Sequence, residues 1–275
     1  MEIREQVWSP LQNTAVWLGA WLYHLESTDS LVDALSSLGG QQCVDALSGL
    51  AADLVSNYGV GEEPAFIDLL ALIRQRTEGV SAADGPVLRL VLHGPGDAAA
   101  LPVGSAAAAA TAVQGEGALV MRTNEDTHLV LVPRRNSART YWQLFEEHQA
   151  FPSPAWLGPG EADLLLSEAT NESSTLIETV QTDAPHRIAA LRAPCLSVGL
   201  LSDFFDSPGL PAVVPARSAK IFARADKVAA IIEAVTGIAQ DHTFDYELLR
   251  LSRHIRAART AGVDHALMDF ARRCT

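Results

Sequence analysis

Lysine is nearly absent from this 275-residue chain, where Lys220 and Lys227 are the two examples. The phosphate-binding pattern G-x-x-x-x-G-K-[ST] does not occur, which excludes P-loop nucleotide chemistry. The nucleophile pattern G-x-S-x-G is missing too. None of the eight histidines forms an H-x-x-H, H-x-x-x-H or HExxH pair. The sequence therefore proposes no metal centre and no cofactor.

Cysteine is scarce, and long apolar runs are missing. The three cysteines, Cys43, Cys195 and Cys274, lie far apart and form no CxxC pair, which favours a reducing compartment. The chain starts MEIREQ, without the basic and apolar regions of a signal peptide. The apolar stretch at 15–25 is too short to span a bilayer. We expect a cytoplasmic protein that does not enter the membrane.

Charge is predominantly acidic and unevenly distributed. The formal net charge is −13, so nucleic acid and anionic membranes are poor partners. Residues 217–275 carry ten basic and seven acidic side chains, which gives +3, whereas residues 1–216 carry ten and 26, which gives −16. The basic end could dock on an acidic surface of the same chain or of a second copy, or it could simply be a solvated face.

The first eighty residues predict helices. Ser9-Pro10 is typical of a helix start, and the helix from Pro10 to about Glu26 is apolar nearly all round. We expect Trp17 and Trp21 to be largely buried on one face, in the core or in a homodimer contact. Three more helices are expected after it, one capped by Asp29 or Ser30, one at 42–57 and one at 63–75.

A small β-α-β-β unit follows at 85–135. Alternating apolar residues bounded by turn residues predict strands at 87–93, 118–123 and 127–133. Ser105 is expected to cap an alanine-rich helix that stops before Gly115. The fold class is therefore α+β and predominantly helical, with helices packed around about three strands.

The remainder, 136–275, is expected to be helical. Helices are predicted at 138–149, 161–180, 215–236, 243–260 and 264–273, with an irregular region over 182–215 and a break at Gly262. We expect one globular unit over 1–275, with 1–80, 85–135 and 136–275 as sub-regions.

The segment HGPGD at 93–97 is the main candidate for chemistry. His93 could serve as a general base beside Asp97, and Ser105 follows nearby. The glycines imitate a dinucleotide-binding turn, but Pro102 and Gly104 interrupt the helix that such a turn requires. We therefore favour a tight turn that leaves a strand as the explanation of the segment.

Three stretches carry a family resemblance. They are LRLVLHGPGDAAALP, then GEGALVMRT with LVLVP, then LPAVVPARSAKIFARADKVAAII. Together they resemble a group of uncharacterised actinobacterial proteins. The group has no assigned activity, so the resemblance implies no catalytic residues.

Two functions remain open. The first is a non-enzymatic binding or regulatory protein that acts through protein contacts, as a homodimer. The second is an enzyme of unknown reaction with a pocket at the HGPGD turn, using His93, Asp97 and Ser105. A pocket with converging polar groups at that turn would favour the enzyme.

Overall fold

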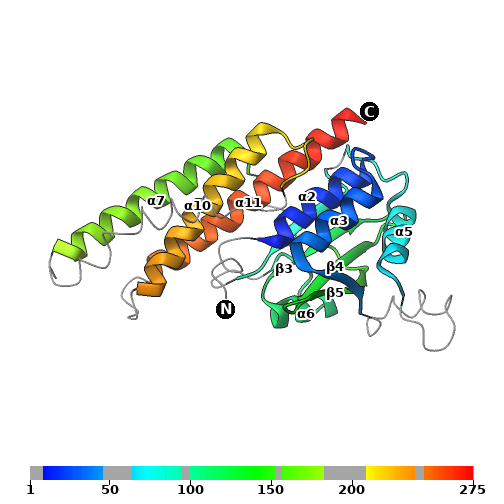
Figure 1. The fold of residues 1–275 in the computed structure, drawn as a ribbon, viewed down its shortest axis with the longest axis horizontal. Coiled ribbons are helices and arrows are strands. Elements are labelled where there is room, and N and C mark those ends of the chain that lie inside the picture. The colour runs from blue at the N-terminus through cyan, green and yellow to red at the C-terminus, as the bar shows by residue number, and fades with distance from the viewer. Residues whose placement is uncertain are drawn as a thin grey trace. The chain divides into compact units, whose positions relative to one another are not determined.

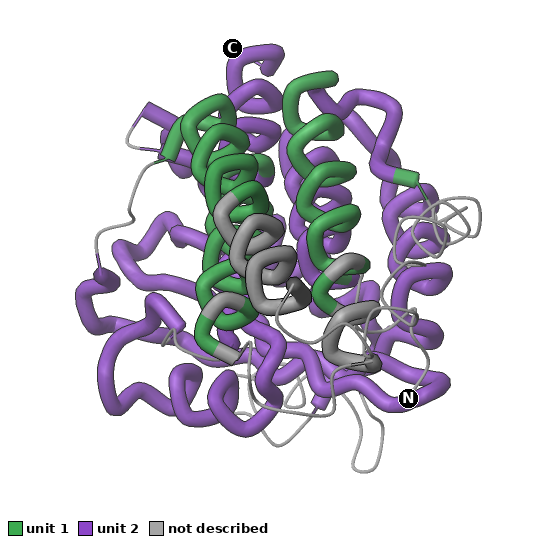
Figure 2. The backbone as a smooth tube through the Cα atoms, turned by 90° about the vertical axis from the view of Figure 1, so that its left-hand side faces the viewer, with its two compact units in different colours: residues 1–9, 156–209, 216–262 green, residues 10–155, 210–215, 263–275 purple. Residues whose placement is uncertain are grey.

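The computed structural model describes residues 9–45, 64–83, 85–94, 99–152, 157–182, 209–238 and 245–274. Its contacts divide the chain into two compact units (Figure 2). Unit 1 consists of residues 1–9, 156–209 and 216–262, and unit 2 of residues 10–155, 210–215 and 263–275.

Unit 2 is built on a mixed five-stranded sheet with the order β1-β5-β4-β3-β2 (Figure 1). The strands are β1 (Gln41–Val44), β2 (Leu88–Leu92), β3 (Gly117–Arg122), β4 (His128–Arg135) and β5 (Arg139–Glu147). Neighbours are antiparallel except β1, which pairs in parallel with β5.

Both faces of the sheet are covered, because side chains alternate along each strand. Leu119 and Leu131 face α2 (Pro10–Leu22), α3 (Thr28–Gly39) and α5 (Phe66–Thr77). Val120 and Val130 point to the other face, where they form a core cluster with Ala107 of α6 (Ala106–Gln114). Unit 2 is therefore a three-layer arrangement with apolar packing on both sides of the sheet.

The three predicted strands are present as β2, β3 and β4, but the prediction of about three strands was wrong. Segment 138–149, expected to be a helix, forms β5 instead. Thr140, Trp142 and Leu144 of β5 are buried at every second position, which is the period of a strand and not of a helix. The helix expected at 42–57 is also wrong at its start, where β1 lies, and 46–57 falls outside the described residues.

The first helix matches its prediction closely. Pro10 opens α2, and the buried residues of α2 lie all round the helix. Trp21 is buried with 2% of its surface exposed, whereas Trp17 is half-buried. Because α2 packs on α3, β2 and β3 inside unit 2, its apolar sides belong to the core of the chain. The expected burial of Trp21 is confirmed.

The described residues of unit 1 form three long helices. Helices α7 (Pro159–Thr182) and α10 (Ala216–Ile238) pack side by side, and Arg224 pairs with Asp163 between them at 2.8 Å. Helix α11 (Asp245–Arg273) joins α10 through an ion pair of Arg259 with Asp226, also at 2.8 Å. The predicted irregular region at 182–215 lies almost wholly outside the described residues.

The break expected at Gly262 is wrong, because α11 is continuous through it. A Cβ atom at Gly262 would lie 2.5 Å from a ring carbon of Phe222 and 2.7 Å from a methyl carbon of Ile221. The glycine therefore permits close packing of α11 on α10. From Val263 onward α11 belongs to unit 2, where Leu267 contacts Gly19 of α2.

Candidate binding groove

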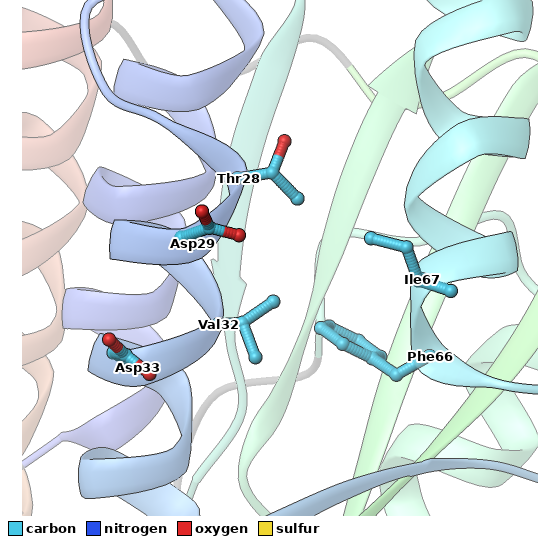
Figure 3. Close-up of a pocket in the computed structure, with 6 residues that line it drawn as sticks. All are labelled: Thr28, Asp29, Val32, Asp33, Phe66 and Ile67. Atoms are coloured by element: carbon cyan, nitrogen blue, oxygen red, sulfur yellow. The ribbon is translucent and has the colours of Figure 1, made fainter.

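A groove of about 490 Å³ opens between the first turns of α3 and α5 (Figure 3). The side chains of Thr28 and Val32 point across it toward Phe66 and Ile67, while Asp29 and Asp33 lie on the α3 side. The groove therefore has an apolar wall from α5 and a wall of mixed apolar and acidic character from α3.

Local sequence fixes the α3 wall. Ser27 caps α3, because its Oγ accepts a hydrogen bond from the backbone N–H of Ser30 at 3.0 Å. This cap replaces the expected cap at Asp29 or Ser30, since helical backbone already begins at Thr28. Asp29 and Asp33 are four residues apart and consequently share one side of the helix. Both carboxylates are exposed.

The α5 wall begins at a helix N-terminus that is capped by a side chain of the same helix. The backbone N–H of Ala65 donates to the Asp68 carboxylate at 3.0 Å, which orients the first turn. Phe66 is half-buried, and Ile67 remains 51% exposed. A half-exposed isoleucine beside a phenylalanine gives the groove apolar surface that a ligand can contact.

A clamp centred on Trp21 connects the two walls. The indole N–H of Trp21 donates to Thr28 Oγ1 at 3.0 Å, which attaches the start of α3. The Arg74 guanidinium of α5 lies 4.0 Å from the Trp21 ring centroid and donates to the Trp21 carbonyl oxygen at 3.1 Å. Since Trp21 is buried, this clamp holds α3 and α5 at a fixed spacing.

The groove is acidic. Among the described residues no basic side chain forms an ion pair with Asp29 or Asp33. Asp29 sits in the first turn of α3, where it offsets the partial positive charge of the helix N-terminus. Asp33 lies one turn further on and leaves the groove with net negative charge.

The predicted turn site holds a different set of polar groups. The backbone N–H of His93 donates to the carbonyl oxygen of Glu116 at 3.2 Å, and the Glu116 carboxylate accepts from Arg135 Nε at 2.9 Å. His93 Nδ1 and Glu116 Oε1 are buried and lack hydrogen-bond partners among the described residues. The structure thus brings His93 next to Glu116, a neighbour that the sequence alone did not indicate. Asp97 lies outside the described residues.

Ser105 does not lie beside His93, and its side chain caps the N-terminus of α6. Its Oγ accepts from the backbone N–H of Ala108 at 3.1 Å, which confirms the predicted capping of α6. Glu147 Oε1 accepts from the backbone N–H of Ala107 at 3.2 Å, so a carboxylate of the chain already occupies this helix N-terminus.

The sheet register separates Ser105 from His93. Glu147, beside the start of α6, pairs with the first residue of β4, whereas Glu116 contacts Arg135, the last residue of β4. The length of β4 is roughly 20 Å at the rise of a strand. Ser105 and His93 therefore lie near opposite ends of the sheet and do not form one site.

A third polar cluster, which the sequence did not indicate, lies around Arg89. Asp264 of α11 is buried, and burial raises its pKa to about 6, although the nearby Arg89 acts in the opposite direction. Burial, followed by the charges of Arg89 and Arg122, lowers the pKa of His128, whose ring packs 4.3 Å from that of Phe151. Asp264 and Arg89 are far apart in sequence, so no local pattern could have joined them.

The described ranges show neither a cluster of metal ligands nor a membrane-spanning helix. No group of three or more His, Cys, Asp or Glu residues in these ranges has a geometry that could hold a metal ion. None of the helices described combines the length and the apolar character needed to cross a membrane.

The fold is thus a mixed α+β sheet domain, followed along the chain by a helical region. Comparison with protein families gives the same division: the Rv1486c-like protein, N-terminal domain, matches residues 12–156, and the Rv1486c-like protein, C-terminal domain, matches residues 160–260. The chain belongs to the Rv1486c-like family, which confirms the expected membership of an uncharacterised family. No curated protein and no solved structure matches the chain.

Proposed function

We propose that this protein is a non-enzymatic, cytoplasmic binding protein that acts through protein contacts, with the groove between α3 and α5 as its recognition surface. The observation that carries the proposal is the groove itself, where exposed Ile67 and half-buried Phe66 lie across from Thr28 and Val32, with two exposed carboxylates on the α3 side. Its open shape suits a segment of another protein better than a small molecule, which proteins usually enclose.

A homodimer belongs to the same proposal. The charge difference between residues 1–216 and 217–275 supports self-association in which unlike charges set the orientation. Light scattering behind a sizing column tests it, and a mass near 29.4 kDa at low salt and at about 0.5 M salt would reject the dimer.

A photo-reactive amino acid at position 67, introduced in cells, tests the recognition surface. We expect a defined protein adduct whose purified partner binds the purified chain and loses binding to Ile67→Asp. The same amino acid at Val113, which is 81% exposed on α6, is the control and should not yield that adduct. Adducts that are equal at both positions would contradict the proposal.

One observation favours the alternative, an enzyme with its site at the HGPGD turn. His93 Nδ1 and Glu116 Oε1 are buried without partners among the described residues, and such groups often mark functional sites. A thermal-shift screen of metabolites and metals against the wild type and His93→Ala tests it. A ligand that raises the melting temperature of the wild type alone would favour the enzyme.

A further inference from the structure

We infer that the groove between α3 and α5 receives a basic, amphipathic helix from a partner protein. This inference rests on the proposed function and specifies the chemistry of its partner. Three features of the groove carry it: the apolar wall, the spacing of the carboxylates and the rigid separation of the walls.

The apolar wall of the groove favours a ligand that has an apolar face. Phe66 and Ile67 come from the first turn of α5, and Val32 faces them from α3. A volume of about 490 Å³ accommodates a few aliphatic side chains. Helical ligands present such a set at i, i+3, i+4 and i+7, which is the usual way a helix occupies an apolar groove.

The carboxylates of Asp29 and Asp33 favour a ligand that carries positive charge beside its apolar face. Asp29 and Asp33 are one helical turn apart, about 6 Å along α3. Arginine or lysine residues four apart on a partner helix have the same spacing. An acidic helix would bring like charges together, and nucleic acid would bring phosphates to the same carboxylates.

The clamp keeps the groove open for this ligand. Trp21 connects to Thr28 on one wall and to Arg74 behind the other, so neither helix can close the gap without breaking a buried contact. A preformed groove avoids the cost of ordering its walls when the partner binds.

The test uses the full-length protein and three labelled peptides of about 18 residues, a length at which an amphipathic helix can form. The first carries leucines at i, i+3, i+4 and i+7 with flanking arginines. In the second the arginines are replaced by glutamates, and the third scrambles the first so that the apolar face is lost. Fluorescence anisotropy gives each Kd at low and at about 0.5 M salt.

We expect the first peptide to bind at least tenfold more tightly than either of the others. Asp29→Asn with Asp33→Asn should weaken it about tenfold, which is the order expected for two exposed charge pairs. Glu78→Gln with Asp126→Asn removes two exposed charges elsewhere in unit 2 and should leave the Kd unchanged.

Four results would overturn the inference. They are equal binding of the acidic peptide, equal binding of the scrambled peptide, a Kd unaffected by the change at Asp29 and Asp33, and displacement of the peptide by the protein itself at high concentration. The last would assign the groove to a second copy of the chain, and it would leave the proposed protein-contact function standing. If the photo-reactive amino acid at position 67 gives no specific protein adduct in cells, in contrast, the proposed function itself is contradicted, independently of the peptide binding results.

Discussion

The guanidinium of Arg74 lies over the buried ring of Trp21, 4.0 Å from its centroid, and donates to the carbonyl oxygen of the same residue. Two interactions of one side chain with one residue fix α5 against α2. Because Trp21 also donates to Thr28 Oγ1, the start of α3 is tied to the same point. The geometry of the groove therefore depends on a residue that does not line it.

Removing the Arg74 side chain should destabilise unit 2. Arg74→Ala loses the cation–π contact and the hydrogen bond, at a cost of about 2 kcal/mol in the free energy of unfolding. Arg74→Lys keeps the charge but loses the planar guanidinium group, so its stability should lie between those of the wild type and of Arg74→Ala. Urea unfolding measures both, and an alanine variant as stable as the wild type would contradict the clamp.

Gly262 provides a second stability test, this time between α10 and α11. Gly262→Ala places a methyl group against Phe222 and Ile221, so we expect a loss of about 1–3 kcal/mol, typical of overpacking. Gly158→Ala is the control, because a Cβ there would meet no atom of the described residues within 4 Å. Equal melting temperatures for the two variants would mean that α11 does not need close contact at Gly262.

Asp264 should make stability depend on pH. Its pKa is raised from 3.8 to about 6, so the folded state holds this proton more tightly than the unfolded chain. Stability should therefore rise as the pH falls from 7 to about 4, by about 2 kcal/mol from this group alone. Asp264→Asn should be more stable than the wild type at pH 7, and the difference should disappear near pH 4.

The control for this effect is Asp126→Asn, which changes an exposed carboxylate in a turn whose positive φ asparagine tolerates. Denaturant unfolding between pH 4 and 7 compares the three proteins. If the wild type were instead more stable than Asp264→Asn, and increasingly so as the pH rises, the result would contradict a pKa of Asp264 that is raised by burial.

His93→Ala should leave the fold intact. The residue follows the last residue of β2, and its ring nitrogen Nδ1 makes no hydrogen bond to the described residues. We expect a change of less than about 1 kcal/mol in the free energy of unfolding, since the half-buried side chain is not part of the core cluster beneath the sheet. A loss of several kcal/mol would make His93 structural and would weaken the enzyme alternative.

Local patterns predicted much of the fold, and tertiary effects explain what they missed. Pro10, Ser105 and the alternation in β2, β3 and β4 are local signals, and each element formed where it was expected. β1 is four residues long and polar at its start, so its place is set by pairing with β5. Gly262 resembles a helix end in sequence, but the packing of Phe222 against it decides its role.

The candidate site was harder to predict than the fold. Asp29 and Asp33 are recognisable as neighbours on a helix, but Phe66 lies more than thirty residues away. The Trp21 clamp and the shared packing of α3 and α5 on the sheet bring the two walls together, and no short motif encodes a contact between separate helices. His93 and Ser105 were close in sequence, yet the sheet separates them by the length of β4.

Amide chemical shifts test the central claim most directly. Isotope-labelled full-length protein is titrated with the basic amphipathic peptide, and the change at each backbone N–H is mapped onto the chain. We expect the largest changes at 28–33 and 65–68, the first turns of α3 and α5, with little change at His93 and Glu116. Changes concentrated at His93 and Glu116, or no change at the two helices, would contradict it.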